Sequence, residues 1–213
     1  MSYSERAPHA EFLELIVAAD VAGAGLEAQR LCTRLGLLAF YDDVVEVVIE
    51  TFEEQVRRHK LTAAEMYTHA AAVQAAAATA YELVPWPART AGTVVVACAP
   101  HERHGFGARV AADAFALAGW RDVFLGPGLD VQAIAAAVTQ HDASVLALSI
   151  TLKTNVEGAR ETVERARRAR PDLRVVIGGK AVRGFAAADL NANAVALSAR
   201  EARDVACTFR RER

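Results

Sequence analysis

The stretch VVVACAPHERHGFGARVAADAFALAGW, residues 94–120, decides how the rest of the chain is interpreted. It begins with a fully apolar segment, which is followed by two histidines, a glutamate and an arginine. Two glycines then come before a helical pattern begins. A plain turn from a strand to a helix needs only one glycine and a capping residue. Packing gives no reason to crowd His101, Glu102 and His104 together, so the stretch predicts a binding loop at the end of a buried strand.

After this loop, short apolar runs alternate with helical segments. Continuous Val, Ile and Leu runs flanked by helices are typical of parallel strands that are buried on both faces. The pattern predicts a flavodoxin-like, doubly wound sheet of five parallel strands, which binds ligands at the carboxyl ends of its strands. The expected strands span residues 93–98, 122–125, 144–149, 173–177 and 194–197, with helices between them and one after the last.

Residues 9–83 have the period of helices instead. In YDDVVEVVIETFEEQV (41–56) the apolar residues recur every three or four positions, which makes one helix face. The next helix opens on a predicted capping box of Thr62 and Glu65. Two earlier helices, at about 9–21 and 25–37, are expected to be separated by the small residues of VAGAG. Four helices with short connections predict an antiparallel bundle.

Two prolines in VPWPART separate the helical half from the half with strands, because Pro85 and Pro87 disfavour helical conformation at and before their positions. We therefore expect three segments: a helical bundle cap in 1–84, a linker in 85–91, and a Rossmann-like domain in 92–213.

The bulk composition excludes several classes of function. The 213 residues carry a net charge of −2 and no block of like charges beyond a short arginine-rich end, so no direct nucleic-acid partner is expected. Three cysteines lie far apart in apolar surroundings, which favours buried thiols in a reducing cytoplasm over disulfides. The first residues lack a signal-peptide pattern and no apolar run is long enough to cross a membrane. We expect a cytoplasmic protein without a membrane partner.

Common binding sites do not fit the loop. In a dinucleotide fingerprint starting at GFGARV, the third glycine would be Val110, and no acidic residue ends the second strand. A phosphoacceptor domain would need an aspartate after the third strand, where Ser149 and Thr151 stand. The two histidines of the loop lack a third ligand for zinc.

The pattern that remains is Glu102-x-His104-x-x-Gly107. A histidine two residues after a carboxylate can present one ring nitrogen to a metal, while its other nitrogen donates to the carboxylate and fixes the tautomer. Gly107 lets a bulky group approach the start of the following helix.

This pattern resembles the Asp-x-His-x-x-Gly signature of cobalamin-binding domains. In that family the histidine replaces the cofactor's own benzimidazole below the cobalt, and the displaced nucleotide tail enters a channel beside the sheet. LALSITLKT (146–154) resembles the segment whose serine contacts the tail, and VVIGGKAV (175–182) resembles the double glycine that lines its far end. The resemblance implies His104 as the lower cobalt ligand, and cofactor contacts from Glu102, His104, Gly105, Gly107, Ser149, Thr151, Gly178 and Gly179.

Two departures affect the choice of function. Glutamate replaces aspartate at Glu102, and Thr151 stands where many members have leucine. The Glu-x-His variant is similar to that of cobalamin-dependent photoreceptors and is rarer among methyl-carrying corrinoid proteins and mutases.

His69 shares a helix face with Met66 and Val73, so its imidazole is expected to point toward the bundle or the cofactor. Taken alone, it is interpreted as a buried histidine bonded to a neighbouring carbonyl. The photoreceptor resemblance implies instead an upper cobalt ligand after light breaks the cobalt–carbon bond. The tryptophan that the photoreceptors carry about ten residues earlier is absent here, and the helix is rich in alanine. The resulting space raises the hypothesis of a second chromophore, biliverdin, as in the photocobilins.

The resemblance implies an adenosylcobalamin-binding light sensor, in which photolysis of the cobalt–carbon bond changes the cap and an association surface. Without a catalytic domain or a DNA-binding domain, the protein is expected not to be an enzyme by itself and to act through an unidentified protein partner or self-association. Two alternatives stay open: a methyl-carrying corrinoid protein for a methyltransferase system, and a non-photochemical cobalamin sensor.

Overall fold

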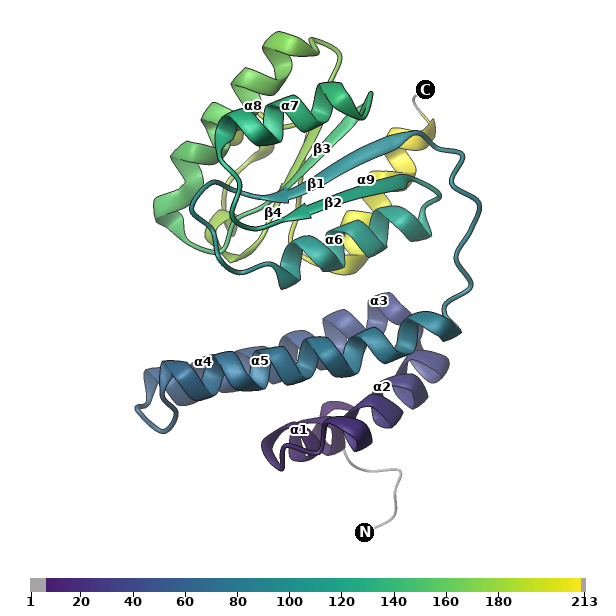
Figure 1. The fold of residues 1–213 in the computed structure, drawn as a ribbon, viewed down its shortest axis with the longest axis vertical. Coiled ribbons are helices and arrows are strands. Elements are labelled where there is room, and N and C mark those ends of the chain that lie inside the picture. Colours follow the sequence, from purple (N-terminus) through teal and green to yellow (C-terminus); the bar gives the residue numbers. More distant parts are fainter. Residues whose placement is uncertain (1–6, 212–213) are drawn as a thin grey trace. The chain divides into compact units, whose positions relative to one another are not determined.

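The computed structural model describes residues 7–211. The chain forms two compact units, one ending at Pro85 and the other beginning at Trp86 (Figure 1). The first unit is helical and the second is built around a parallel sheet.

From residue 7 onward, the helical unit contains four helical segments around one apolar core, as predicted. One of them, which spans Leu37–Arg57, is continuous through a π-helical stretch in its middle. Phe12 and Phe40 meet edge to face, with ring centroids 5.6 Å apart, and Phe52 and Val73 are buried in the same unit. The elements are α1 (His9–Val17), α2 (Val21–Leu35), α3 (Leu37–Phe40), the π-helix η1 (Tyr41–Val45), α4 (Glu46–Arg57), α5 (Ala63–Ala78) and the 3-10 helix η2 (Thr79–Leu83).

The VAGAG stretch is the first turn and a half of α2, so the prediction that it separates two helices is wrong. Asp20 caps this helix, because its side chain accepts a hydrogen bond from the backbone N–H of Gly23 at 2.9 Å. Gly25 brings α2 close to Thr79, whose hydroxyl donates to the Gly25 carbonyl oxygen at 2.9 Å. The small residues therefore serve close helix packing. The same helix ends at Leu35 because Gly36 has a φ of 82°.

The capping box at the start of α5 is present as predicted. The Thr62 hydroxyl accepts from the backbone N–H of Glu65 at 3.2 Å, and the Glu65 carboxylate accepts from the backbone N–H of Thr62 at 2.7 Å.

The second unit is a five-stranded parallel sheet with the strand order β2-β1-β3-β4-β5, which confirms the flavodoxin-like prediction. Its elements are β1 (Thr93–Cys98), α6 (Phe106–Leu117), β2 (Arg121–Gly126), α7 (Val131–Gln140), β3 (Val145–Ser149), η3 (Lys153–Asn155), α8 (Val156–Ala169), β4 (Arg174–Gly178), η4 (Lys180–Val182), η5 (Ala187–Leu190), β5 (Ala194–Ala196) and α9 (Ala199–Arg211).

Helices cover both faces of this sheet (Figure 1). Helices α7 and α8 pack on the face that carries Val95, Leu146 and Val175, while α6 and α9 cover the other face. The strand β1 lies between β2 and β3 and is buried throughout. At the carboxyl ends of the strands, Cys98 of β1 lies opposite Ser149 of β3, and Ser149 lies opposite Gly178 of β4. The loops that follow β1, β3 and β4 therefore leave the sheet at one edge.

Candidate functional site

The loop after β1 turns back at once and buries a carboxylate. The backbone N–H of Glu102 donates to the Ala99 carbonyl oxygen at 3.0 Å, and His101 takes a left-handed conformation with a φ of 65°. This tight turn aims the Glu102 side chain inward, where the residue is only 1% exposed. Because a buried carboxylate needs donors on both oxygens, its partners define the site.

Each oxygen of Glu102 accepts three N–H donors. Oε1 accepts from its own loop, and Oε2 accepts from the loop that follows β3. The donors to Oε1 are the backbone N–H groups of Arg103 at 3.0 Å and His104 at 3.2 Å and the His104 ring nitrogen Nδ1 at 2.5 Å; those to Oε2 are the backbone N–H groups of Thr151 at 2.9 Å and Leu152 at 3.1 Å and the Asn155 side-chain amide at 3.2 Å. The carboxylate thus joins the loops after β1 and β3.

The environment keeps Glu102 ionised. Burial by itself would raise the pKa of this carboxyl, but the hydrogen bonds from His104, Thr151 and Leu152 outweigh it and bring the pKa down to about 2.

An ionised carboxylate can only accept hydrogen bonds, so Nδ1 of His104 must be the protonated ring nitrogen. The lone pair of the neutral imidazole then lies on Nε2, which is the nitrogen that a metal would take. The His104 side chain is 42% exposed, so a ligand can reach the ring. The arrangement predicted for Glu102 and His104 from their spacing is present, and it is suited to present one imidazole nitrogen to a metal ion.

Cys98 lies beside this pair but does not offer a second ligand. Its thiol donates to the His104 carbonyl oxygen at 3.4 Å. Burial, with a smaller contribution from the Glu102 charge, raises the pKa of the Cys98 thiol to about 12. The thiol therefore stays protonated and supports the backbone of the loop.

The two loop glycines make close contacts at the start of α6. A Cβ on Gly105 would lie 3.1 Å from Cδ of Pro127, and one on Gly107 would lie 3.1 Å from Oγ of Ser149. Ser149 is only 6% exposed, and its hydroxyl makes no hydrogen bond within residues 7–211. Gly107 and Ser149 therefore face each other across the junction of α6 and β3, with a buried hydroxyl available to a ligand.

Gly178 and Gly179 have a structural reason to be glycine that is independent of any ligand. A Cβ on Gly178 would lie 2.4 Å from the Ala196 carbonyl oxygen, and one on Gly179 would lie 2.3 Å from that of Ile150. Gly179 also has a φ of 105°, which favours glycine. Their predicted contact with a nucleotide tail stays a prediction.

His69 belongs to the helical unit, where its ring stacks on Phe52 with centroids 4.6 Å apart and an interplanar angle of 17°. The ring is partly buried and lies on the stripe shared with Val73, as the helical spacing predicted. Its partner in the bundle is thus an aromatic ring. The structure brings Glu102, His104 and the Thr151 backbone together, and it places His69 in the other unit.

Asn155 is the site residue that the sequence analysis missed. It is buried at the end of η3 and donates to Glu102 from 53 positions away. No local sequence pattern predicts the hydrogen bond between Asn155 and Glu102, because it depends on β1 and β3 being neighbours in the sheet.

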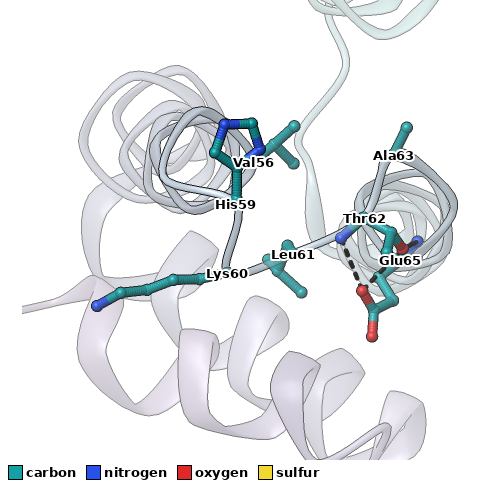
Figure 2. Close-up of a pocket in the computed structure, with 7 residues that line it drawn as sticks. All are labelled: Val56, His59, Lys60, Leu61, Thr62, Ala63 and Glu65. Atoms are coloured by element: carbon teal, nitrogen blue, oxygen red, sulfur yellow. Dashed lines mark hydrogen bonds between the residues drawn. The ribbon is translucent and has the colours of Figure 1, made fainter.

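A depression at the turn between α4 and α5 contains none of the predicted site residues. Figure 2 shows the side chains that line it: Val56, His59, Lys60, Leu61, Thr62, Ala63 and Glu65.

The described part of the chain holds no group of three or more His, Cys, Asp or Glu side chains that could bind a metal ion. Among residues 7–211, no helix combines the length and apolarity that spanning a membrane requires.

Solved structures with this architecture include three corrinoid or cobalamin proteins. The monomethylamine corrinoid protein of Methanosarcina barkeri is 18% identical, with a TM-score of 0.82 over 94% of this chain and 97% of that one. A chain of the methanol:cobalamin methyltransferase complex from the same organism is 16% identical, with a TM-score of 0.55 over 99% of this chain and 82% of that one. A cobalamin-binding protein of Desulfitobacterium hafniense is 18% identical, with a TM-score of 0.51 over 93% and 96%. At these identities the matches establish a shared fold.

A search of curated protein sequences gave no match. The B12 binding domain family, in contrast, matches residues 92–209, which cover the whole sheet and the loops that hold Glu102 and His104. This match spans more than half of the chain, and the protein therefore belongs to the B12-binding domain family.

Proposed function

We propose that this protein is a corrinoid protein that carries a methyl group for a methyltransferase system. The observation that carries the proposal is the match to the monomethylamine corrinoid protein, which extends over nearly the full length of both chains and includes the helical unit. Cobalamin as the cofactor follows from membership of the B12-binding family. The complex of a related chain with a methanol:cobalamin methyltransferase supports a protein partner of that class.

The residues of the site fit cobalamin on two observations. The first is the His104 tautomer, since Glu102 occupies Nδ1 and directs the metal to Nε2. The second is the junction of Gly107 and Ser149, where a buried hydroxyl has no protein partner among the described residues and the facing position carries no side chain. Such a junction suits a polar group of a ligand that enters beside the sheet.

When bound, cobalamin supplies a cobalt that can accept and release a methyl group. The protein's own residues would hold and orient it: His104 would ligate the cobalt, and Glu102 fixes the orientation of the imidazole through its contact with Nδ1. Thr151, Leu152 and Asn155 in turn hold the Glu102 carboxylate. Because Glu102 stays ionised far below neutral pH, the orientation of the imidazole should not depend on pH in the physiological range.

The light-sensor interpretation rested on glutamate at position 102 and on His69. Two of the solved structures described above are a monomethylamine corrinoid protein and a chain of a methanol:cobalamin methyltransferase complex, which favours the methyl-carrier alternative. The His69 ring also stacks on Phe52 within its own unit. Adenosylcobalamin as the bound form and biliverdin as a second chromophore remain predictions without support from the comparisons.

The first experiment tests the cofactor site. Protein purified with hydroxocobalamin should show histidine-ligated cobalt, and His104→Ala should lose this spectrum or bind cobalamin more weakly. Glu102→Gln should weaken binding by about 10–100-fold, as changes behind a metal ligand usually do. The matched control is His101→Asn, because asparagine tolerates the left-handed conformation of this exposed neighbour. An unchanged spectrum and affinity in His104→Ala would contradict the site.

The second experiment separates methyl transfer from light sensing. A methyl carrier should be reduced by titanium(III) citrate, methylated by iodomethane and demethylated by a thiol while cobalamin stays bound. After loading with adenosylcobalamin and green light, it should give the same photoproduct in wild type and His69→Ala. A stable bis-imidazole spectrum that disappears in His69→Ala would overturn the methyl-carrier proposal in favour of a light sensor.

A further inference from the structure

The turn between α4 and α5 concentrates the positive charge of the helical unit. Residues 1–85 carry six Lys and Arg against thirteen Asp and Glu, which gives a net charge of −7. Three of those six cations, Arg57, Arg58 and Lys60, fall within four consecutive positions, and His59 stands between them. All four side chains are exposed, so packing does not account for them. The turn is therefore a basic spot on an acidic unit.

Backbone hydrogen bonds fix the conformation of this turn. The N–H of Lys60 donates to the Gln55 carbonyl oxygen at 2.8 Å, and the N–H of His59 donates to the Val56 carbonyl oxygen at 3.0 Å. His59 takes a left-handed conformation with a φ of 55°, at a place where the end of a helix commonly carries glycine. This conformation is strained for histidine. A role for the exposed ring would explain why histidine occupies a position that suits glycine.

One carboxylate orients both arginines of the turn. The Arg57 Nε donates to Oε2 of Glu54 at 2.9 Å, and the Arg58 Nε donates to Oε1 at 2.5 Å. The hydrogen bonds from Arg57 and Arg58 hold the pKa of the Glu54 carboxyl below its usual range. The two arginine side chains are still 66% and 63% exposed. Because a guanidinium has five N–H donors, each arginine keeps donors on its solvent side for a second carboxylate.

The depression beside the turn adds an apolar contact surface. Three of the residues that line it are apolar, namely Val56, Leu61 and Ala63 (Figure 2). The Glu65 carboxylate also lines it, but it accepts from the backbone N–H of Thr62 at 2.7 Å and from the Thr62 hydroxyl at 2.8 Å. That carboxylate is therefore engaged in the helix cap. The depression offers an apolar surface next to the cations of the turn.

We propose that this turn and its depression bind an acidic segment of a partner protein, which places carboxylates against the cations and one apolar side chain against Val56 and Leu61. Charge complementarity favours a partner that bears carboxylates. A nucleic acid fits less well, because Glu54 and Glu65 would lie beside its phosphates and the unit as a whole is acidic. The inference goes beyond the proposed function and does not depend on methyl transfer.

The proposal is tested by isothermal titration calorimetry of the full chain at low salt, with a short peptide of glutamates around one central leucine. The peptide should bind at micromolar concentration, and added salt should weaken it. Two matched peptides carry glutamine for every glutamate or serine for the leucine. Each should bind about tenfold more weakly or worse, since a charged hydrogen bond or a buried leucine contributes at least that much. No binding of the acidic peptide, or equal binding of either matched peptide, would overturn the proposal.

Three substitutions locate the site. Lys60→Glu should weaken the acidic peptide by about tenfold or more. Arg34→Glu makes the same change of sign at an exposed arginine of α2 and should alter the affinity little. His59→Gly should fold normally, because glycine suits the left-handed conformation, and should weaken the peptide through loss of the ring.

Equal affinity of Lys60→Glu and Arg34→Glu, or an unchanged affinity in His59→Gly, would overturn the site. A single-stranded oligodeoxynucleotide that binds as tightly as the acidic peptide would overturn the assignment to a protein segment. Because no methyl donor or methyltransferase takes part, none of these results bears on the proposed function.

Discussion

Replacing Glu102 by glutamine should leave two or three N–H donors without an acceptor, depending on which way the amide lies. Each carboxylate oxygen accepts from three N–H groups. Glutamine has one oxygen and one NH₂ group, and the NH₂ group cannot accept a hydrogen bond. The NH₂ group must therefore point at the backbone N–H groups of one of the two loops, and those N–H groups lose their acceptor.

Two routes give a similar size for this loss. Leaving a buried donor unsatisfied costs about 1–3 kcal/mol, so two or three donors imply roughly 2–3 kcal/mol or more. The pKa of Glu102 lies at about 2, against ~4.3 for an unperturbed glutamate, and a shift of about 2 pKa units corresponds to roughly 3 kcal/mol. We expect Glu102→Gln to lower the free energy of unfolding of the sheet unit by about 3 kcal/mol at pH 7.

The pH dependence has a definite sign. Because the pKa of Glu102 is lower in the folded protein than in the unfolded chain, its stabilisation is complete above pH ~4.3 and is lost as the pH falls toward 2. The difference between wild type and Glu102→Gln should therefore be constant near neutral pH and shrink steadily below pH ~4.3.

The measurement is guanidinium unfolding followed by tryptophan fluorescence, since Trp86 and Trp120 both lie in the sheet unit. Glu157→Gln is the matched control: its side chain is 83% exposed and pairs with Arg160 at 3.3 Å, so its loss should cost less than about 1 kcal/mol. If Glu102→Gln were no less stable than Glu157→Gln at pH 7, the account of the buried carboxylate would be refuted.

Three further substitutions test other parts of the fold. Asn155→Ala removes one donor to Glu102 and should lower the free energy of unfolding of the sheet unit by about 1–2 kcal/mol, measured by the same fluorescence assay; no change would show that the contact adds nothing. Gly179→Ala should prevent the sheet unit from folding normally, because its φ is 105° and its Cβ would lie 2.3 Å from the Ile150 oxygen; a native fluorescence spectrum and stability would contradict this. Thr62→Ala should cost the helical unit about 0.5–2 kcal/mol through loss of the α5 cap, seen by circular dichroism as earlier melting, whereas Thr68→Ala on the exposed face of the same helix should not.

The sequence alone determined the elements whose signals are local. The period of apolar residues identified four helical segments and five strands, because that period is set by neighbours a few positions apart. The sequence also led to the wrong prediction that VAGAG separates two helices, since glycine is a poor helix former. Only the packed bundle explains why these residues are helical: Asp20 caps the first turn, and Gly25 allows α2 to approach Thr79.

The same division runs through the site. Glu102 and His104 are two residues apart, so their hydrogen bond could be predicted from spacing. The other half of the carboxylate's environment comes from Thr151, Leu152 and Asn155, about fifty residues away. Those contacts exist because β1 pairs with β3 in the sheet, and no local pattern encodes that pairing. The burial of Glu102 and the donors to its second oxygen were therefore decided by the tertiary structure. The physical reason is the register of β1 against β3, which places the two loops side by side.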